Sequence, residues 1–270
     1  MHSIFELYLV SLASLKFTQQ NSSYMKILVC ISHVPDTTSK INFTDGDTKF
    51  DTNGVQFVIN PNDEFGLTRA MWFKEKQGAA VHVANVGGPE TEPTLRKALA
   101  IGADEAIRVN TPATDGYSVA KQLAHVVKEG GYDLVIGGRE SIDYNGGMVP
   151  GMVAKMIDAN FVNTCISLEV EGESATAIRE IDGGKETIST KLPLVVGGQK
   201  GLVEESDLRI PNMRGIMQAR SKPLHVKEPV DATAETNTNT FEKPAPKGAV
   251  KLVDTVDELV DLLHNEAKVI

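Results

Sequence analysis

The stretch GGRESIDYNGGMVPG, residues 137–151, combines residue types that suit a phosphate or nucleoside ligand. It contains five glycines and follows the apolar run of residues 134–136. Glycine lets the backbone approach a ligand closely, and a helix starting after Gly146 and Gly147 would offer free N–H groups to a phosphate. Ser141, Asp143 and Asn145 could orient a ribose or a base. The same glycines also fit a tight strand-to-helix connection, so the pattern alone leaves both interpretations open.

Sequence patterns for other kinds of chemistry are missing. Neither GxGxxG nor GxxxxGK[ST] occurs, which argues against a Rossmann dinucleotide motif and a Walker loop. The run Asp182–Lys185 reads DGGK, but a phosphate loop would need glycine at Arg179, so a hairpin turn is favoured. Cys30 and Cys165 lack CxxC spacing and the histidines lack HExxH spacing, which argues against a metal site. No nucleophile–base pair is evident in the sequence, so bond-making chemistry by this chain is not expected.

The composition of the 270 residues is that of a water-soluble globular protein whose main partner is not nucleic acid. The net charge of −9 and the single tryptophan, Trp72, disfavour phosphate-backbone and base-stacking surfaces. Residues 1–24 have an apolar stretch, but Glu6 interrupts it, no basic residue precedes it, and it is too short to span a bilayer. We expect an extension outside the fold, no direct membrane insertion, and a cytoplasmic protein.

From Met25 onward, apolar strands alternate with amphipathic helices. Strands are expected at residues 26–32, 80–86, 106–109 and 132–136, with helices between them, the first of which would be capped by Asn62 or Asp63 and end at Gly78. Extended segments at 165–170, 176–181 and 186–190 follow, and residues 192–198 close the core. Such alternation predicts an α/β fold with a doubly wound, mostly parallel sheet of the flavodoxin-like type.

Three strand ends carry residues that could contact a ligand. In doubly wound sheets, ligands bind beyond the carboxyl ends of the strands, where the strand order reverses. The candidate ends are residues 30–34, 85–89 and 137–151. Their residues are therefore expected to converge on one binding site.

A second informative stretch is RIPNMRGIMQARSK, residues 209–222. It carries four cations and no acid, with apolar residues between them. Met213 and Met217 are spaced so that one helical turn would present both on one face. Methionine suits surfaces that accept several partners, and the cations would speed encounter with acidic ones. The alternative is a helix end whose methionines pack inward.

After residue 222 the composition shifts to Pro, Thr, Asn, Lys and Glu, which predicts an arm without a core of its own. The arm leads to a short helix with a capping box formed by Thr255 and Glu258. Four residues of this helix form an apolar stripe: Val256, Leu259, Val260 and Leu263. The helix needs something to lie against, either this domain or another chain.

Several stretches occur in the order typical of one family: KILVCISHVPD, VINPNDEFGLTRA, TLRKALAIGADEAIRV, YDLVIGGRESID, REIDGGKETISTKLP and RIPNMRGIMQARSKPL. Through them residues 25–270 resemble the β subunit of electron transfer flavoprotein. The resemblance implies a heterodimer whose α subunit holds the redox-active FAD, while the β subunit buries a structural AMP. Electrons would pass from acyl-CoA and related dehydrogenases of fatty acid β-oxidation to the membrane-associated electron transfer flavoprotein–quinone oxidoreductase. In the electron-bifurcating branch of the family, a second FAD replaces the AMP.

The resemblance carries a set of nucleotide contacts onto this chain by position. These are Cys30, Asn60, Pro61, Asn62, Asp63, Gly87, Gly138, Arg139, Glu140, Ser141, Ile142, Asp143, Asn145, Gly146, Gly147, Met148 and Val149. Relatives often place Asn, Gln or Thr toward the phosphate, where this chain has Gly147, Met148 and Val149. Because these side chains donate no hydrogen bonds, a phosphate would depend on backbone N–H groups and the helix end.

The resemblance also implies a partner-binding set. Its members are Arg209, Ile210, Met213, Arg214, Ile216, Met217, Arg220, Lys222 and Glu180. Residues 209–222 correspond to the loop that anchors partner dehydrogenases, with Met213 at the position of the anchoring leucine. Glu180 would pair with an arginine of the α subunit or remain a solvated hairpin charge.

The predicted organisation is an extension (1–24), a nucleotide-binding domain (25–208), a recognition loop (209–222) and an arm with a helix that packs on the α subunit (223–270). Two functions from other classes compete with this interpretation. An ATP-using enzyme such as an ATP pyrophosphatase would need an SGGxDS-like loop where this chain has SHVPDTTS, residues 32–39. A nucleotide-sensing module would work without a partner chain.

Overall fold

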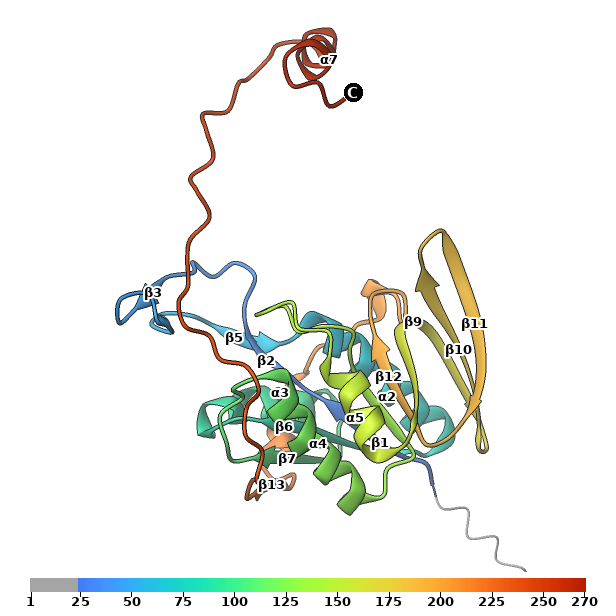
Figure 1. Ribbon diagram of the computed structural model, residues 1–270. Helices are drawn as coiled ribbons and strands as arrows, with labels where there is room; N and C mark the ends of the chain where they lie inside the picture. The colour runs from blue at the N-terminus through green and yellow to red at the C-terminus, as the bar shows by residue number, and fades with distance from the viewer. Residues whose placement is uncertain (1–23) are drawn as a thin grey trace, which may run out of the picture. The chain divides into compact units, whose positions relative to one another are not determined.

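The computed structural model describes residues 24–270, so the predicted extension lies outside the described residues apart from its last residue. The described chain forms two compact units. The first comprises residues 24–40 and 52–237, and the second comprises residues 41–51 and 238–270 (Figure 1). The first unit contains the large sheet and all three predicted ligand-binding strand ends.

The centre of the first unit is a nine-stranded sheet with the order β11-β10-β9-β12-β8-β1-β6-β7-β13. The strands from β9 to β13 in this order run parallel, whereas β10 and β11 form an antiparallel hairpin at one edge. The mostly parallel α/β prediction is therefore confirmed. The bounds are β1 (Lys26–Cys30), β6 (Ala80–Val86), β7 (Glu105–Val109), β8 (Leu134–Gly138), β9 (Asn160–Glu171), β10 (Ser174–Ile181), β11 (Gly184–Lys191), β12 (Leu194–Gly198) and β13 (Leu224–Lys227).

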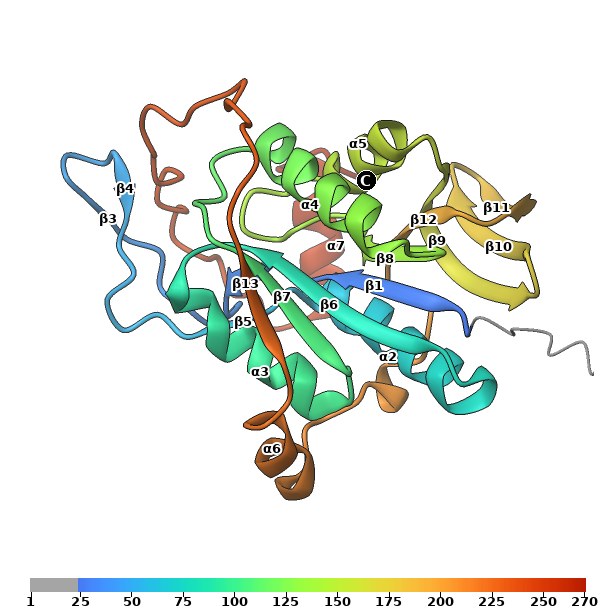
Figure 2. The same cartoon turned by 90° about the horizontal axis from the view of Figure 1, so that it is seen from below.

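Helices cover both faces of this sheet (Figure 2). One face carries α2 (Pro61–Gln77), α3 (Glu92–Ile101) and α6 (Met213–Ala219), and the other carries α4 (Gly116–Gly130) and α5 (Val149–Ile157). Successive residues of β1 alternate between the two cores, so Ile27 packs on the α2 side and Leu28 on the α4 side. Both cores are apolar, which explains the near-continuous hydrophobic strands.

The strand order reverses beside β1. From β1 the chain passes through α2, β6, α3 and β7 in one direction, and then returns to place β8 on the opposite side of β1. The carboxyl ends of β1 and β8 therefore flank the topological switch point, the usual ligand position in such sheets. The predicted glycine turn begins at the end of β8.

Shorter elements surround the sheet. β2 (His33–Pro35) pairs with β5 (Phe57–Ile59), and two short 3-10 turns, η1 (Pro89–Thr91) and η2 (Glu205–Asp207), join larger elements. The predicted hairpin at residues 182–185 is confirmed as the link between β10 and β11.

The predicted boundaries were wrong at the first helix and at the start of the arm. The helix after residue 60 begins at Pro61 with Asn60 as its N-cap residue, so Asn62 and Asp63 lie inside its first turn. Proline fits this first helical position because its missing N–H would be unpaired there in any case. The arm was predicted to begin at residue 223, but residues 224–227 extend the sheet as β13.

The second unit joins a small hairpin to the arm. The hairpin consists of β3 (Phe43–Thr44) and β4 (Lys49–Phe50). The ring of Phe241 stacks on that of Phe43 with centroids 4.8 Å apart, and the Phe241 amide donates to the Asp47 carbonyl at 2.7 Å. A short helix, α7 (Val256–Asn265), has the predicted cap Thr255, whose hydroxyl accepts from the Glu258 amide.

The predicted apolar stripe of α7 is accessible. No residue of this helix is buried, and Val256, Leu259 and Val260 are exposed. Within residues 24–270, no helix has the length and apolar character needed to cross a membrane.

Candidate functional site

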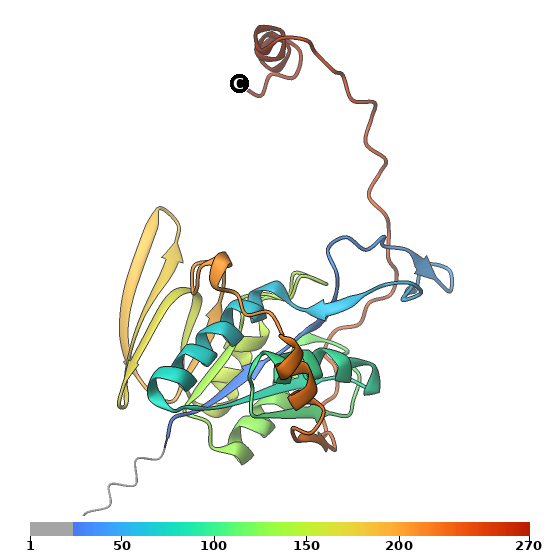
Figure 3. The same ribbon diagram turned by 180° about the vertical axis from the view of Figure 1, so that it is seen from behind.

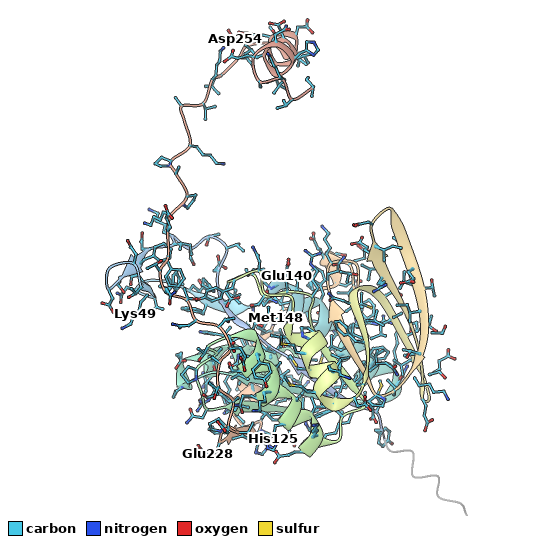
Figure 4. The ribbon with its side chains drawn as sticks, viewed as in Figure 1. Lys49, His125, Glu140, Met148, Glu228 and Asp254 are labelled. Carbon is cyan, nitrogen blue, oxygen red and sulfur yellow. The ribbon has the colours of Figure 1, made fainter. Side chains whose placement is uncertain are left out.

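The turn between β8 and α5 folds back on itself. The Ser141 amide donates to the Gly146 carbonyl at 3.0 Å, and the Ser141 hydroxyl donates to the Asp143 carboxylate at 2.6 Å. Ser141 and Asp143 therefore shape the turn in addition to any ligand role, while Asn145 is exposed at its tip. Figure 4 labels Glu140 and Met148, which lie at the two ends of this turn.

The first residues of α2 hold the turn in place. The Asn60 side-chain amide donates to the Glu140 backbone carbonyl at 2.9 Å, and the Asn62 side-chain amide donates to the same oxygen at 3.2 Å. The Ile142 amide in turn donates to the Asn60 side-chain oxygen at 3.3 Å. The structure thus brings together the two groups that were predicted separately, residues 60–63 and residues 138–149.

Gly138 sits where these groups meet most closely. Its amide donates to a carboxylate oxygen of Asp63 at 2.7 Å. A Cβ atom at Gly138 would lie 2.5 Å from that oxygen and 2.7 Å from the Cβ of Asn62. Glycine therefore lets the end of β8 approach the side chains at the start of α2 closely, and Pro61 is the first residue of that helix.

The end of β1 contributes Cys30 and the loop that follows it. The Ser32 amide donates to the second carboxylate oxygen of Asp63 at 2.7 Å. Burial, with the nearby Asp63 carboxylate, raises the pKa of the Cys30 thiol to about 12, so the thiol is neutral and not a nucleophile. Burial also raises the pKa of Asp63 to about 7, against the opposing effect of its hydrogen bonds.

Gly87 follows β6, and its carbonyl accepts from the Arg108 guanidinium at 3.0 Å rather than contacting the glycine turn. Arg108 is 4% exposed and also donates to Asn110 at 2.7 Å. We did not predict this brace from the sequence. A charged residue between the apolar Ile107 and Val109 of β7 was the available signal, because an arginine is rarely buried without partners.

The start of α5 fits an anionic group. No side chain caps this helix, and its N-cap position is occupied by Met148. The Met148 side chain is turned toward the start of α4, since a Cβ at Gly116 would lie 2.8 Å from its Cγ and Sδ atoms. The backbone N–H groups of the first turn, from Val149 and Gly151, are those that a helix leaves without internal partners. Because the side chains of residues 147–149 donate no hydrogen bonds, a phosphate would be bound there by backbone N–H groups.

Open space also adjoins the turn. A Cβ built on Gly146 would meet no atom within 4 Å, whereas one on Gly147 would approach the Arg139 carbonyl to 3.1 Å. In the part of the chain that the structure describes, no three His, Cys, Asp or Glu residues cluster as metal ligands would. The turn therefore offers open space and backbone donors beside the start of α5.

The predicted recognition segment contains α6, which packs on α3 (Figure 3). Its apolar residues face solvent: Ile210 is 85% exposed, Met213 76%, Met217 68% and Ile216 41%. The alternative in which the methionines pack inward is therefore wrong. Only the small Ala219 of this helix is buried.

The cations of this segment divide into two pairs. Arg214 and Arg220 are exposed. Arg209 instead contacts Glu75 at 2.6 Å. The Lys222 ammonium points inward and donates to the carbonyls of residues 99 and 103, at the end of α3, at 3.0 and 2.5 Å. Because a lysine at a helix C-terminus stabilises the helix dipole, Lys222 is positioned to secure the segment.

Arg96 of α3 is a further anchor that we did not predict. One of its guanidinium nitrogens donates to the carbonyls of Ala219 and Lys222, both at 2.8 Å. The sequence shows no signal for this role, because the contact joins residues more than one hundred positions apart.

Glu180, on the hairpin strand β10, is connected to the glycine turn. Its carboxylate accepts from the Gln199 side-chain amide. Gln199 in turn accepts from Arg139 at 3.3 Å, and Arg139 pairs with Glu140 at 3.0 Å. Glu180 is exposed, but its carboxylate is paired, so it is not a free hairpin charge. We did not predict the linking role of Gln199 from the sequence.

Comparisons with known proteins identify the family of the chain. The model of the electron transfer flavoprotein domain family matches residues 47–232. The chain is 37% identical to "Electron transfer flavoprotein subunit beta" of Bacillus subtilis, covering 91% of this chain and 100% of that protein. It is 32% identical to the protein of that name from Syntrophomonas wolfei (91% and 98%) and 31% identical to that from Homo sapiens (91% and 99%).

Proposed function

Since the chain belongs to the electron transfer flavoprotein family and is related to its β subunits, we propose that it is the β subunit of a heterodimeric electron carrier. In this proposal it pairs with an FAD-bearing α subunit, binds a structural AMP, and docks acyl-CoA-type dehydrogenases. Electrons then continue to the quinone oxidoreductase. The chain itself makes and breaks no covalent bonds.

The observation that carries the proposal is the convergence of the expected nucleotide contacts at the switch point. Residues 60–63 and 138–142 are joined there by hydrogen bonds. The loop after β1 joins them, because the Ser32 amide donates to the Asp63 carboxylate. The backbone N–H groups of Val149 and Gly151 would hold the phosphate, and the turn from Ser141 to Gly146 would face the nucleoside. The neutral Cys30 thiol fits a structural role for the nucleotide, because a thiol whose pKa is raised to about 12 is a poor nucleophile.

The exposed face of α6 supports docking of dehydrogenases. Met213 and Met217 form an apolar surface beside the exposed Arg214 and Arg220. Apolar anchors surrounded by charge are typical of protein–protein contacts. The exposed stripe of α7 supports a contact with the α subunit, since an isolated amphipathic helix needs an apolar partner.

The FAD held by the α subunit would supply the redox chemistry by accepting and releasing electrons. The residues of this chain would position the partners. Their part is to keep the nucleotide turn rigid and to present α6 at a fixed place on the domain. No group of this chain needs to change its oxidation state.

The test is electron transfer through the reconstituted heterodimer. The chain is co-expressed with its α subunit, and an acyl-CoA dehydrogenase with its substrate is added without oxygen. We expect the flavin absorbance of the heterodimer to bleach and to recover when the quinone oxidoreductase and quinone are added. A heterodimer that stays oxidised beside every acyl-CoA-type dehydrogenase tested, yet is reduced by dithionite, would contradict the proposed role.

A further inference from the structure

One buried carboxylate joins the two loops at the switch point. Asp63 accepts from the Ser32 amide with one oxygen and from the Gly138 amide with the other, both at 2.7 Å. Ser32 follows β1 and Gly138 ends β8, the two strands between which the strand order reverses. Asp63 is 2% exposed and lies in the first turn of α2, so a rigid helix holds it in place.

The bonds of Asp63 to Ser32 and Gly138, together with the bonds of two asparagines to Glu140, form a clamp on the turn. The asparagine bonds join neutral groups, so Asp63 alone carries charge in this clamp. Asn60 and Asn62 bind the Glu140 carbonyl through their amides. A hydrogen bond to an ionised acceptor is about twice as strong as one between neutral groups. The clamp therefore depends most on the state of Asp63.

We propose that Asp63 is a positioning residue for the nucleotide, whose ionised carboxylate fixes the Ser32 and Gly138 amides and so presets the turn that binds adenylate. This inference rests on the proposed function, and it replaces the expectation that Asp63 contacts the nucleotide directly. Nucleotide affinity is then linked to the protonation of Asp63.

Protonation weakens the clamp for a chemical reason. An ionised carboxylate is an acceptor at both oxygens, whereas the protonated form has one O–H donor. A backbone N–H facing that oxygen loses its acceptor, so one of the two Asp63 bonds that fix Ser32 and Gly138 is lost. Because burial raises the pKa of Asp63 to about 7, this change falls within the physiological range.

The other titratable groups near Asp63 are neutral or paired, so we assign the pH dependence of nucleotide affinity to Asp63. The Cys30 thiol on β1 is neutral because burial raises its pKa to about 12, and burial lowers the pKa of His33 on β2. On α2, Glu64 pairs with Lys97 of α3 at 2.9 Å, and in the turn Arg139 pairs with Glu140.

The phosphate charge acts in the opposite direction. An anion near Asp63 would favour the protonated carboxyl group. The helix end that would bind the phosphate begins at Val149, at the far end of the turn from Gly138. The Asp63 carboxylate is also buried, and hydrogen bonds from Ser32, Gly138 and Asn60 already compensate its charge. We therefore expect the preset geometry of the turn to affect AMP affinity more than the repulsion between Asp63 and the phosphate.

The test compares AMP affinities of the nucleotide-stripped heterodimer by calorimetry at pH 8 and pH 5.5. The variants are wild type, D63N and the matched control E64Q, which makes the same change one residue further along α2. An asparagine at position 63 turns an N–H donor toward one backbone N–H. Loss of one charge-assisted bond predicts about tenfold weaker binding at pH 8 for D63N.

At pH 5.5, where wild-type Asp63 is itself protonated, the difference should shrink to about twofold or less. The phosphate of AMP titrates near pH 6 as well, but it does so equally in all variants, so the ratio of affinities isolates Asp63. E64Q should follow wild type at both pH values. A ratio that does not change with pH, or tighter binding by D63N, would overturn the inference while leaving AMP binding intact.

A second measurement needs no substitution and no nucleotide. The amide NMR signals of Ser32 and Gly138 in the wild-type heterodimer should shift together with a midpoint near pH 7. Signals that do not titrate between pH 5.5 and 8.5 would also overturn the inference. Absence of AMP binding by the wild type at both pH values would instead refute the proposed function.

Discussion

Replacing Gly215 by alanine should weaken docking, although alanine is the better helix former. Gly215 lies in α6, and a Cβ on it would stand 2.3 Å from the carbonyl oxygen of Ala100 in α3. That oxygen belongs to the backbone of a packed helix, so it cannot rotate away as a side chain would. α6 must therefore move by about 1 Å to restore an ordinary van der Waals distance.

Two opposing effects decide the outcome. Alanine gains about 1 kcal/mol in helix propensity over glycine. Overpacking against a fixed neighbour costs about 1–3 kcal/mol, and the displacement also strains the bonds from Arg96 to the carbonyls of Ala219 and Lys222. The steric effect should exceed the gain in propensity, so α6 is displaced and loosened while the nine-stranded sheet stays intact.

The assay combines hydrogen exchange of residues 209–222 with the affinity of the heterodimer for an acyl-CoA dehydrogenase. For G215A we expect faster exchange in this segment and roughly five- to tenfold weaker docking, equivalent to about 1–1.4 kcal/mol. The matched control is Gln218→Ala, an exposed position of the same helix with no such contact. It should leave exchange and docking unchanged or slightly improved. Slower exchange in G215A with unchanged docking would refute the packing argument.

Three other outcomes are expected. Met213→Ala should reduce dehydrogenase affinity in surface plasmon resonance by about tenfold or more without changing the melting temperature, because Met213 is 76% exposed; an equal loss of both would contradict a docking role. Asp115→Asn should keep the cap of α4, since asparagine caps equally well, but it should speed amide exchange at Glu235 and Thr236, which donate to the second Asp115 oxygen at 2.7 and 2.9 Å; unchanged exchange would show that this oxygen does not hold the arm. Burial raises the pKa of Asp63 from 3.8 to about 7, so between these pH values the native state binds more protons than the unfolded state. The free energy of unfolding in urea should therefore fall by a few kcal/mol between about pH 4 and pH 7 relative to D63N. Parallel plots of unfolding free energy against pH for the two proteins would contradict the shift.

Much of the fold could be predicted because its signals are local. Buried parallel strands are continuously apolar, and the helices between them are amphipathic, so element order and the strand-end position of the site followed from the sequence. The edge strand β13 was missed because Leu224–Lys227 is short, and residues 225 and 226 are exposed. Only its pairing with β7 distinguishes it from the arm.

The candidate site was predicted as a set of residues but not as a set of contacts. Asn60 and Asp63 were predicted as ligand contacts, and the structure adds that both are buried and bond the turn some 75 to 80 positions away. Lys222 was assigned to a charged docking surface, but its ammonium caps α3. Such roles depend on tertiary distances, for which a single sequence carries no periodic signal.

The central claim is that the turn between β8 and α5 binds adenylate in a carrier whose flavin belongs to the α subunit. The most direct measurement is extraction and quantification of the nucleotides from the co-purified heterodimer by chromatography and mass spectrometry. We predict one FAD and one AMP per heterodimer. Two flavins without AMP, or one flavin with no adenylate, would contradict the account.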